Sequence, residues 1–411
     1  MAVQAVQGTA GPRFAAVREE LERNFAERGE VGASVCLTVD GETVVDLWGG
    51  VADPETRAPW TRDTIGLVWS CTKGATSLCA HVLAARGAID LDAPVARYWP
   101  EFAKGGKDWV TVRMLLSHQA GLPALREPIP ENGLCDWNAV VDALAAMEPL
   151  WEPGTRHGYH PLVFGHLVGE VVRRVTGRSL GAFFRGEVAE PLGLDFWIGL
   201  PSEHETRVAP DIPADPPAPG QPVPQFYVAA MTDPGSVPGM VVWNSGGYLL
   251  PGAVNTRQVH AAEIPSANGI TNARGLAGMY RPLALGGAFG GVRLVPEDAV
   301  PAMGAVSAAV AKDATMFVPT RWASGFMKGV DNHRLPPGQS DSVILSEEAF
   351  GHLGNGGSIG FADPKARLSF GYTMNKLGGG IGLDARGQAL VDAAYRALGY
   401  RRAASGGMWF A

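Results

Sequence analysis

The feature of the sequence that most constrains the fold is the placement of strand-like segments at both ends of the chain. Near the start, "GASVCLTVDG" (32–41) and "ETVVDLWGG" (42–50) are β-type runs that meet at Asp40-Gly41, a dipeptide typical of hairpins. Near the end, "FGHLGNGGSIGFADPKARLSFGYTMNK" (350–376) alternates glycine turns with β-type runs. An amphipathic helix is predicted beside each set, at 12–29 and at 386–399.

The middle of the chain has a different pattern and predicts a mainly helical insertion. "WVTVRMLLSHQAGL" (109–122) and the segment 163–194 are helix-like, whereas 209–226 is too rich in proline for a helix interior or a central strand. We therefore expect an α+β fold in which an antiparallel sheet is flanked by helices. The predicted domains are a sheet domain and an inserted helical domain that contains the proline-rich loop, with boundaries as follows: 1–100 with 290–411, and 101–289.

Composition excludes several classes of protein. A length of 411 residues with 46% hydrophobic and 18% charged residues fits a large globular core, and a net charge of -7 gives no basic surface for nucleic acid or an anionic membrane. We find no run of about 18 apolar residues and no signal-like N-terminus, so a soluble, cytoplasmic protein is expected. The spacing of the four cysteines fits no metal or redox motif and predicts mainly buried thiols. The oligomeric state stays open.

The segment "GLVWSCTKGATSLCAHVLAARG" (66–87) carries the chemistry. A helix is predicted from about Ser70 to Arg86, with Gly87 as its C-terminal glycine. Residues three apart share one helix face, so Lys73 can reach the Ser70 hydroxyl. A partly desolvated lysine could then take the proton of a serine nucleophile. By itself the S-x-x-K pattern is common, and its plainer reading is an exposed lysine.

Four blocks in order make the pattern specific: "SCTK" (70–73), "VTVRMLLSHQAGLP" (110–123), "WEPGTRHGYHPLVFGHLVGEVVRRVTG" (151–177) and "FGHLGNGGSIGF" (350–361). In these blocks the chain resembles the serine β-lactamase-like superfamily from about residue 15 to residue 398. The most similar branch contains class C β-lactamases, DD-peptidases and the carboxylesterases often called family VIII.

The resemblance implies roles for individual residues. Ser70 matches the acylated nucleophile and Lys73 its helix partner, while Tyr159 matches the tyrosine that carries the proton to the leaving group. The backbone N–H groups of Ser70 and Asn355 match the oxyanion hole, because "HLG" at 352–354 aligns with the family's K-T-G. Which of lysine and tyrosine is the base is left open. The chemistry implies no cofactor and no metal.

Two departures from the family pattern bear on the substrate. Pro161 replaces the asparagine of Tyr-x-Asn, and His352 replaces the lysine that favours an anionic carboxylate. A histidine is mostly neutral at pH 7. The expected substrate is therefore a small-molecule ester of short to medium chain length. Substrate contacts are expected at His352, Gly354 and Gly356, since an edge strand without side chains allows close approach.

Alternative functions remain. The same centre could serve an acyltransferase or hydrolyse amides and β-lactams, and a relative that binds ligand without turnover is the non-enzyme alternative. Retention of serine, lysine and tyrosine together favours an enzyme.

Other signals predict structural roles. "GGSIG" (356–360) matches G-x-S-x-G, but no histidine follows Ser358, so an α/β-hydrolase elbow is excluded. His157 and His160 lack the further ligands that zinc needs. The apolar tail at 408–410 could dock on this chain or on a second subunit. Several large aromatics of the middle region are each expected to be core rather than pocket: Trp69, Trp137, Trp151, Phe226, Tyr227 and Trp243.

Overall fold

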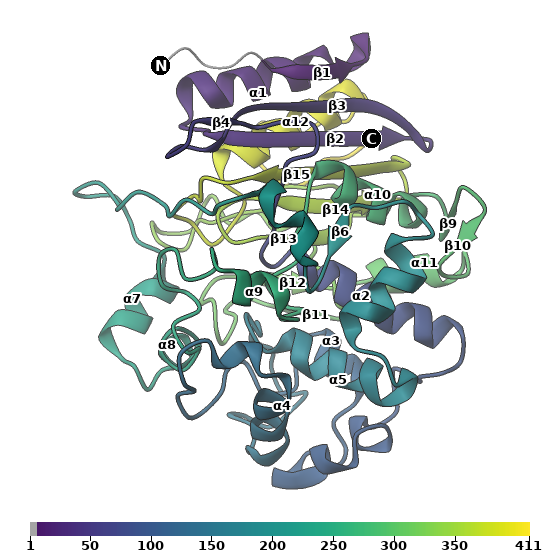
Figure 1. The fold of residues 1–411 in the computed structure, drawn as a ribbon, viewed down its shortest axis with the longest axis vertical. Coiled ribbons are helices and arrows are strands. Elements are labelled where there is room, and N and C mark those ends of the chain that lie inside the picture. The colour runs from purple at the N-terminus through teal and green to yellow at the C-terminus, as the bar shows by residue number, and fades with distance from the viewer. Residues whose placement is uncertain (1–5) are drawn as a thin grey trace.

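The structure is a computed structural model that describes residues 6–411. One end of the molecule is a seven-stranded antiparallel sheet with strand order β1-β3-β2-β15-β14-β13, to which β4 adds by pairing with β3 (Figure 1). Its strands have the following bounds: β1 Gln7–Ala10, β2 Gly32–Val39, β3 Glu42–Asp53, β4 Ala58–Pro59, β13 Phe350–Leu353, β14 Ile359–Asp363 and β15 Leu368–Met374. The predicted α+β fold is confirmed.

The sheet joins the two ends of the chain. Strand β2 pairs with β15 in the register Val35 to Tyr372, so segments more than 300 residues apart in sequence lie side by side. The hairpin between β2 and β3 turns at Asp40 and Gly41, with φ angles of 52° and 84°. Two successive positive φ values are what a two-residue type I′ turn requires, and the Asp-Gly prediction is confirmed.

Helices cover both faces of the sheet. Helices α1 (Ala15–Glu27) and α12 (Ala385–Ala397) pack on the face that bears Val35 and Phe370. Helix α10 (Ala273–Ala284), capped by the Asn272 side chain as predicted, packs on the other face. Its close approach depends on mid-strand glycines: a Cβ at Gly371 would lie 2.3 Å from the Ala273 carbonyl oxygen. Glycines of this segment therefore serve helix packing as well as turns.

The other end of the molecule is mainly helical, and α2 (Thr72–Ala85) lies between it and the sheet, packed against α5 and β13 (Figure 1). Its helices are α3 Val112–Leu116, α4 Trp137–Ala146, α5 Phe164–Thr176, α6 Leu180–Phe184, α7 Gln225–Thr232, α8 Val237–Trp243 and α9 Arg257–Ala261. A second sheet of short strands contacts β3 and α10 of the sheet end: β5 Ile65–Leu67, β6 Phe196–Trp197, β7 Val208–Ala209 and β8 Ile270–Thr271. The remaining elements are β9 Ala288–Phe289, β10 Val292–Arg293, α11 Ala299–Gly304, β11 Ala308–Val310 and β12 Thr320–Trp322.

The division into domains at residues 100 and 289 stays a prediction. Helix α10 precedes residue 290 yet packs on the large sheet, which favours a second boundary before residue 273.

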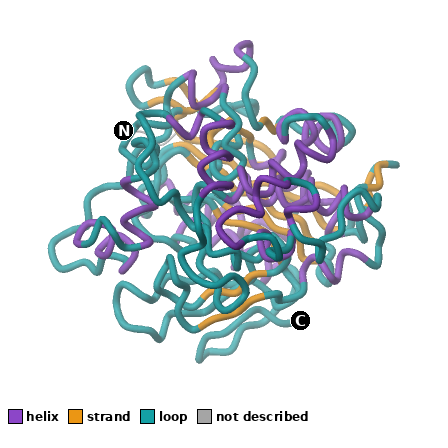
Figure 2. Tube along the Cα trace, turned by 90° about the horizontal axis from the view of Figure 1, so that it is seen from below, coloured by secondary structure: helices purple, strands orange, loops and turns teal. Residues whose placement is uncertain are grey.

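Loops make up much of the remaining chain (Figure 2). Most of the proline-rich segment, from Pro213 to Val223, is the predicted surface loop, whereas Ala209 belongs to a strand and Asp211 and Pro224 are buried. The C-terminal tail docks on its own chain: Trp409 is buried and stacks on Tyr395 at 5.8 Å between ring centroids. Across residues 6–411 we find no helix with the length and apolar character needed to cross a membrane.

Candidate active site

Ser70 lies in the turn that leads into α2, and α2 ends as predicted at Ala85 with Gly87 at a φ of 70°. The preceding residue, Trp69, has a φ of 48°, a left-handed conformation that is unusual for a bulky residue and common at functional sites. The indole Nε1 of Trp69 donates a hydrogen bond of 2.8 Å to the buried Asp211. This contact holds the strained residue directly before Ser70.

Lys73 is completely buried beside Ser70. Its Nζ lies 3.0 Å from Ser70 Oγ, 2.6 Å from the carbonyl oxygen of Pro161 and 2.8 Å from that of Ser266. Burial lowers the pKa of Lys73 well below its usual value. A neutral amine has two N–H bonds for the two carbonyls, and its lone pair then faces the Ser70 hydroxyl. In this form the amine can accept a proton from Ser70.

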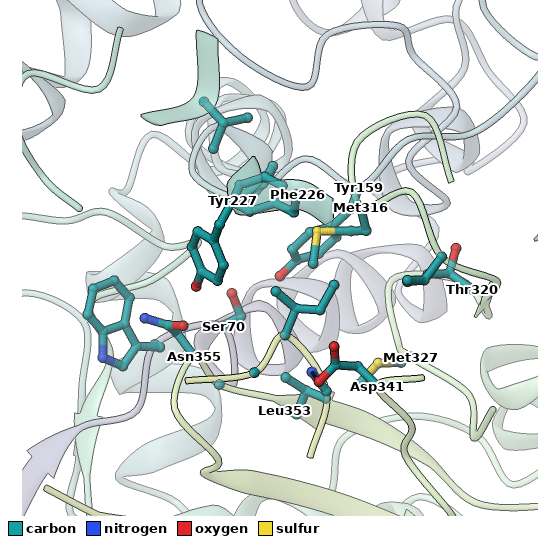
Figure 3. A pocket seen from close by; sticks show the side chains of 18 of the residues that line it. Ser70, Tyr159, Phe226, Tyr227, Met316, Thr320, Met327, Asp341, Leu353 and Asn355 are labelled. Carbon is teal, nitrogen blue, oxygen red and sulfur yellow. Dashed lines mark hydrogen bonds between the residues drawn. The ribbon is translucent and has the colours of Figure 1, made fainter. Parts of the chain in front are cut away.

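Tyr159 lies in the loop before α5, next to Ser70 and Lys73. Lys73 Nζ lies 4.8 Å from the centre of its ring, and Figure 3 shows the hydroxyl groups of Tyr159 and Ser70 pointing toward one another. The ring stacks on Trp322 at 5.0 Å and is nearly parallel to it. Burial raises the pKa of the Tyr159 phenol above its usual range, and hydrogen bonding with Ser70 opposes this in part. The phenol therefore holds its proton next to the serine oxygen.

The backbone of Tyr159 is held by Asp313, a residue that the sequence analysis missed. The buried Asp313 carboxylate accepts hydrogen bonds from the N–H groups of Tyr159 (3.0 Å), Thr315 (2.8 Å) and Met316 (2.9 Å) and from the Thr320 hydroxyl (3.0 Å). No local motif marks an aspartate 154 residues away from its tyrosine. Only the folded chain brings the two together.

Two backbone N–H groups face the site without partners. Among the hydrogen bonds of residues 6–411, none uses the N–H of Ser70 or of Asn355. Gly354, the residue before Asn355, packs closely against the segment before Ser70. A Cβ at Gly354 would lie only 2.3 Å from the Val68 carbonyl oxygen, so a larger residue would push the turn that carries Asn355 away. The arrangement can hold an oxyanion.

The glycines after β13 form a turn and not part of the strand, which corrects the expectation of an edge strand without side chains. Gly354 lines the cavity described below, as do Asn355 and His352. Gly356 does not line it. Gly356 has a φ of 84°, and its carbonyl oxygen accepts a hydrogen bond of 3.2 Å from Arg386. Its contribution is to the shape of the loop that carries Asn355.

His352 is neutral in this environment. Its Nδ1 lies 2.7 Å from the Leu353 carbonyl oxygen and is therefore the protonated nitrogen. Burial lowers the pKa of His352 to about 3, and the nearby Lys73 also lowers it. The neutral imidazole agrees with the expectation that this wall of the site carries no positive charge.

Ser70, Tyr159 and His352 line one cavity of about 450 Å³, a size typical of small-molecule sites. Its walls are mostly apolar, and the only carboxylate among them in the described chain is Asp341 (Figure 3). Four of the aromatics expected in the core line the cavity: Trp69, Phe226, Tyr227 and Trp243. Trp69 and Phe226 are also buried in hydrophobic clusters, as expected, whereas Trp243 is exposed and the expectation was wrong for it. Trp137 and Trp151 do not line the cavity.

The residues that the sequence analysis set aside make other contacts in the structure. Ser358 is buried outside the cavity, with Oγ 3.3 Å from the Val68 carbonyl oxygen. His157 Nε2 lies 2.8 Å from Thr320 Oγ1, and His160 Nδ1 lies 2.6 Å from the Gly158 carbonyl oxygen. Within residues 6–411 no group of three or more histidine, cysteine or acidic side chains is arranged to hold a metal ion.

Comparisons with known proteins agree with this geometry. The family model described as Beta-lactamase matches residues 18–394. Esterase/beta-lactamase LipL of Mycobacterium tuberculosis is 37% identical over 381 residues, which cover 90% of this chain and 83% of LipL.

Two solved structures are also similar. A family VIII carboxylesterase has 41% sequence identity and a TM-score of 0.82, covering 95% of this chain and 99% of that one. A penicillin-binding protein homologue from Caulobacter crescentus has 38% identity and a TM-score of 0.81, also covering 95% and 99%. The predicted family resemblance is confirmed, and the chain belongs to the β-lactamase family as an enzyme of the β-lactamase-like hydrolase type.

Proposed function

We propose that this chain is a serine carboxylesterase that hydrolyses uncharged esters of short to medium chain length through an acyl-Ser70 intermediate. The observation that carries the proposal is the Lys73 amine, buried and 3.0 Å from the Ser70 hydroxyl, with two carbonyl oxygens to accept its N–H bonds. An ester is favoured over an acidic amide because Pro161 and the neutral His352 offer no amide or carboxylate recognition.

Acylation begins when Lys73 Nζ takes the Ser70 proton and Oγ bonds to the ester carbonyl carbon. The carbonyl oxygen becomes an oxyanion and accepts hydrogen bonds from the N–H groups of Ser70 and Asn355. As the intermediate collapses, the bond to the alcohol breaks and the departing oxygen takes the proton of Tyr159. The Lys73 ammonium then returns a proton to the phenolate, and Ser70 is left acylated.

Deacylation runs the same groups in reverse. A water molecule gives a proton to the Lys73 amine, directly or through Tyr159, and bonds to the acyl carbon. The second oxyanion uses the same two N–H groups, and Ser70 recovers its proton as the carboxylic acid leaves. The net reaction consumes one ester and one water and yields one acid and one alcohol.

Turnover of p-nitrophenyl acetate and butyrate by wild type, Ser70→Ala and Tyr159→Phe tests the proposal. We expect Ser70→Ala to abolish turnover and Tyr159→Phe to lower kcat about 10²- to 10⁴-fold, the range for loss of a general acid–base group. Tyr280→Phe is the matched control, since that buried hydroxyl has no hydrogen-bond partner among the described residues. Turnover that survives in Ser70→Ala refutes the proposal.

A second candidate is β-lactam hydrolysis, because the similar protein LipL is named an esterase/beta-lactamase. Nitrocefin distinguishes the two activities. Turnover of nitrocefin comparable with that of the esters would overturn the ester preference. Excess alcohol in the ester assay tests for the acyltransferase alternative, which would give a transesterified product.

A further inference from the structure

Exposed apolar side chains gather at one place on the molecule. Of the eight large apolar side chains that are most exposed in the described chain, five lie between residues 223 and 250, on and around α7 and α8. These five are Val223, Val228, Met231, Trp243 and Leu250. Such clustering marks a binding surface more often than isolated exposed residues do. In Figure 1 α7 and α8 lie at the side of the molecule, away from the layered sheet.

Three of these side chains also line the cavity that contains Ser70. Met231 is 68% exposed, Trp243 43% and Leu250 55%, yet each contributes to the cavity wall. We call these three residues the apolar rim. The rim therefore continues the apolar wall of the active site onto the outer surface, and whatever occupies the cavity can extend across it.

The part of the rim that Trp243 forms is held by hydrogen bonds between and within α7 and α8. The Trp243 indole Nε1 donates a hydrogen bond of 2.7 Å to the carbonyl oxygen of Ala230, which joins α8 to α7. The Ser236 hydroxyl caps α8 by accepting from the N–H of Gly239 at 3.1 Å. Because this part of the rim is preformed, binding to it costs little ordering of the protein.

The segment that carries the rim has almost no charge, and Asp341 is the one carboxylate that lines the same cavity in the described chain. Residues 208–256 contain no lysine, arginine, histidine or glutamate, and three aspartates are their only carboxylic acids. Asp211 is buried against Trp69, and Asp215 pairs with Lys376 at 2.7 Å. Only Asp233 remains, so the rim offers no cation for an anionic headgroup. The lack of charge at the rim favours an uncharged, apolar ligand.

We propose that Met231, Trp243 and Leu250 form a distal subsite that binds the apolar tail of the substrate, so that the preferred substrates are uncharged esters whose tail is too long for the inner cavity alone. This inference rests on the proposed function and extends it toward the longer members of that substrate class. The apolar tail can belong to the acyl group or to the alcohol of the ester. Two series of esters, one that varies the acyl chain and one that varies the alcohol, distinguish these cases.

The test compares wild type with the double variant Met231→Ser/Leu250→Ser on p-nitrophenyl acetate, butyrate, octanoate and decanoate, all below the concentrations at which they aggregate. Both side chains are exposed, so the variant should fold. We expect kcat/KM for decanoate to fall about tenfold, equivalent to about 1.4 kcal/mol, and that for acetate less than about twofold. Acetate esters of butanol, octanol and decanol form the second series. A length-dependent loss in that series alone places the tail on the alcohol side.

Val228→Ser is the matched control, because Val228 is exposed on α7 but does not line the cavity. It should leave kcat/KM for every ester unchanged. The subsite would be overturned if the double variant lost kcat/KM equally on the shortest and the longest ester of each series. An unchanged preference for chain length would overturn it too.

A binding measurement tests the subsite independently of the proposed esterase activity. In the Ser70→Ala background, the dissociation constant of an intact decanoate ester should rise about tenfold when the two rim substitutions are added. If wild type has no Ser70-dependent esterase activity but this difference persists, the proposed function fails and the subsite stands. If acetate turnover is normal and both the length dependence and the binding difference are absent, the subsite fails and the function stands.

Discussion

Replacing Asp313 by asparagine should displace the backbone of Tyr159 and so lower kcat. A control at another buried aspartate shows how much of that loss is due to lower stability. One oxygen of Asp313 accepts the N–H of Tyr159, and the other oxygen lies 3.2 Å from the same nitrogen. In Asp313→Asn one of these oxygens becomes an NH₂ group, which donates and cannot accept. An amide nitrogen facing the Tyr159 N–H at this distance is repulsive, so the tyrosine backbone must shift.

The size of the effect follows from the hydrogen bonds. Three backbone N–H groups donate to the carboxylate, and a bond to a charged acceptor is worth about 1.5–3 kcal/mol against about 0.5–1.5 kcal/mol for a neutral one. Neutralising the acceptor should therefore lower the free energy of unfolding by about 2–3 kcal/mol. Displacing a catalytic group by about 1 Å can lower the rate about 10²-fold, so kcat should fall by that order.

Urea unfolding and ester kinetics measure both effects. We expect kcat to fall while KM for butyrate stays within about threefold, because Asp313 does not line the cavity. Asp363→Asn is the control: this equally buried carboxylate accepts from Ser346, Tyr395 and Ala366, far along the sheet. It should lose comparable stability with kcat unchanged. Wild-type kcat in Asp313→Asn would refute the reasoning.

Two further predictions concern the oxyanion hole and the base. Gly354→Ala should lower kcat about 10²- to 10³-fold by moving the Asn355 N–H, because the new Cβ must escape the Val68 carbonyl; ester kinetics showing wild-type kcat would contradict this. Lys73 has a lowered pKa when folded, so the unfolded chain binds the extra proton below about pH 10.4, and the contribution of Lys73 alone to stability rises with pH toward that value, by up to about 1.36 kcal/mol per unit. The free energy of unfolding of wild type minus that of Lys73→Met, measured in urea, should therefore increase between about pH 8 and about pH 10; the subtraction removes the opposite contribution of Cys36, Cys71 and Cys79, whose thiol pKa values are raised by burial. A difference that does not change with pH would contradict the lowered pKa.

Features that depend on neighbouring residues could be predicted from the sequence. The turn at Asp40-Gly41, the cap at Asn272 and the spacing of Ser70 and Lys73 are local, and the structure has each of them. The family resemblance added Tyr159, which lies 89 residues from Ser70 and which no spacing rule could have linked to it.

Features that depend on tertiary packing could not be predicted. Asp313 sits in an unremarkable segment, and its role exists only because the fold brings it to the Tyr159 backbone. The aromatics of α7 and α8 were expected in the core because large rings usually pack. They line a cavity as well, and Trp243 is exposed while Phe226 is buried.

The most direct test of the account is to find which serine becomes covalently modified. Wild-type protein is treated with a fluorophosphonate, residual ester turnover is followed, and the adduct is mapped by mass spectrometry. The account predicts one adduct on Ser70, with turnover lost in proportion to labelling. A label on Ser358 or another serine, or full labelling of Ser70 with turnover intact, would contradict it.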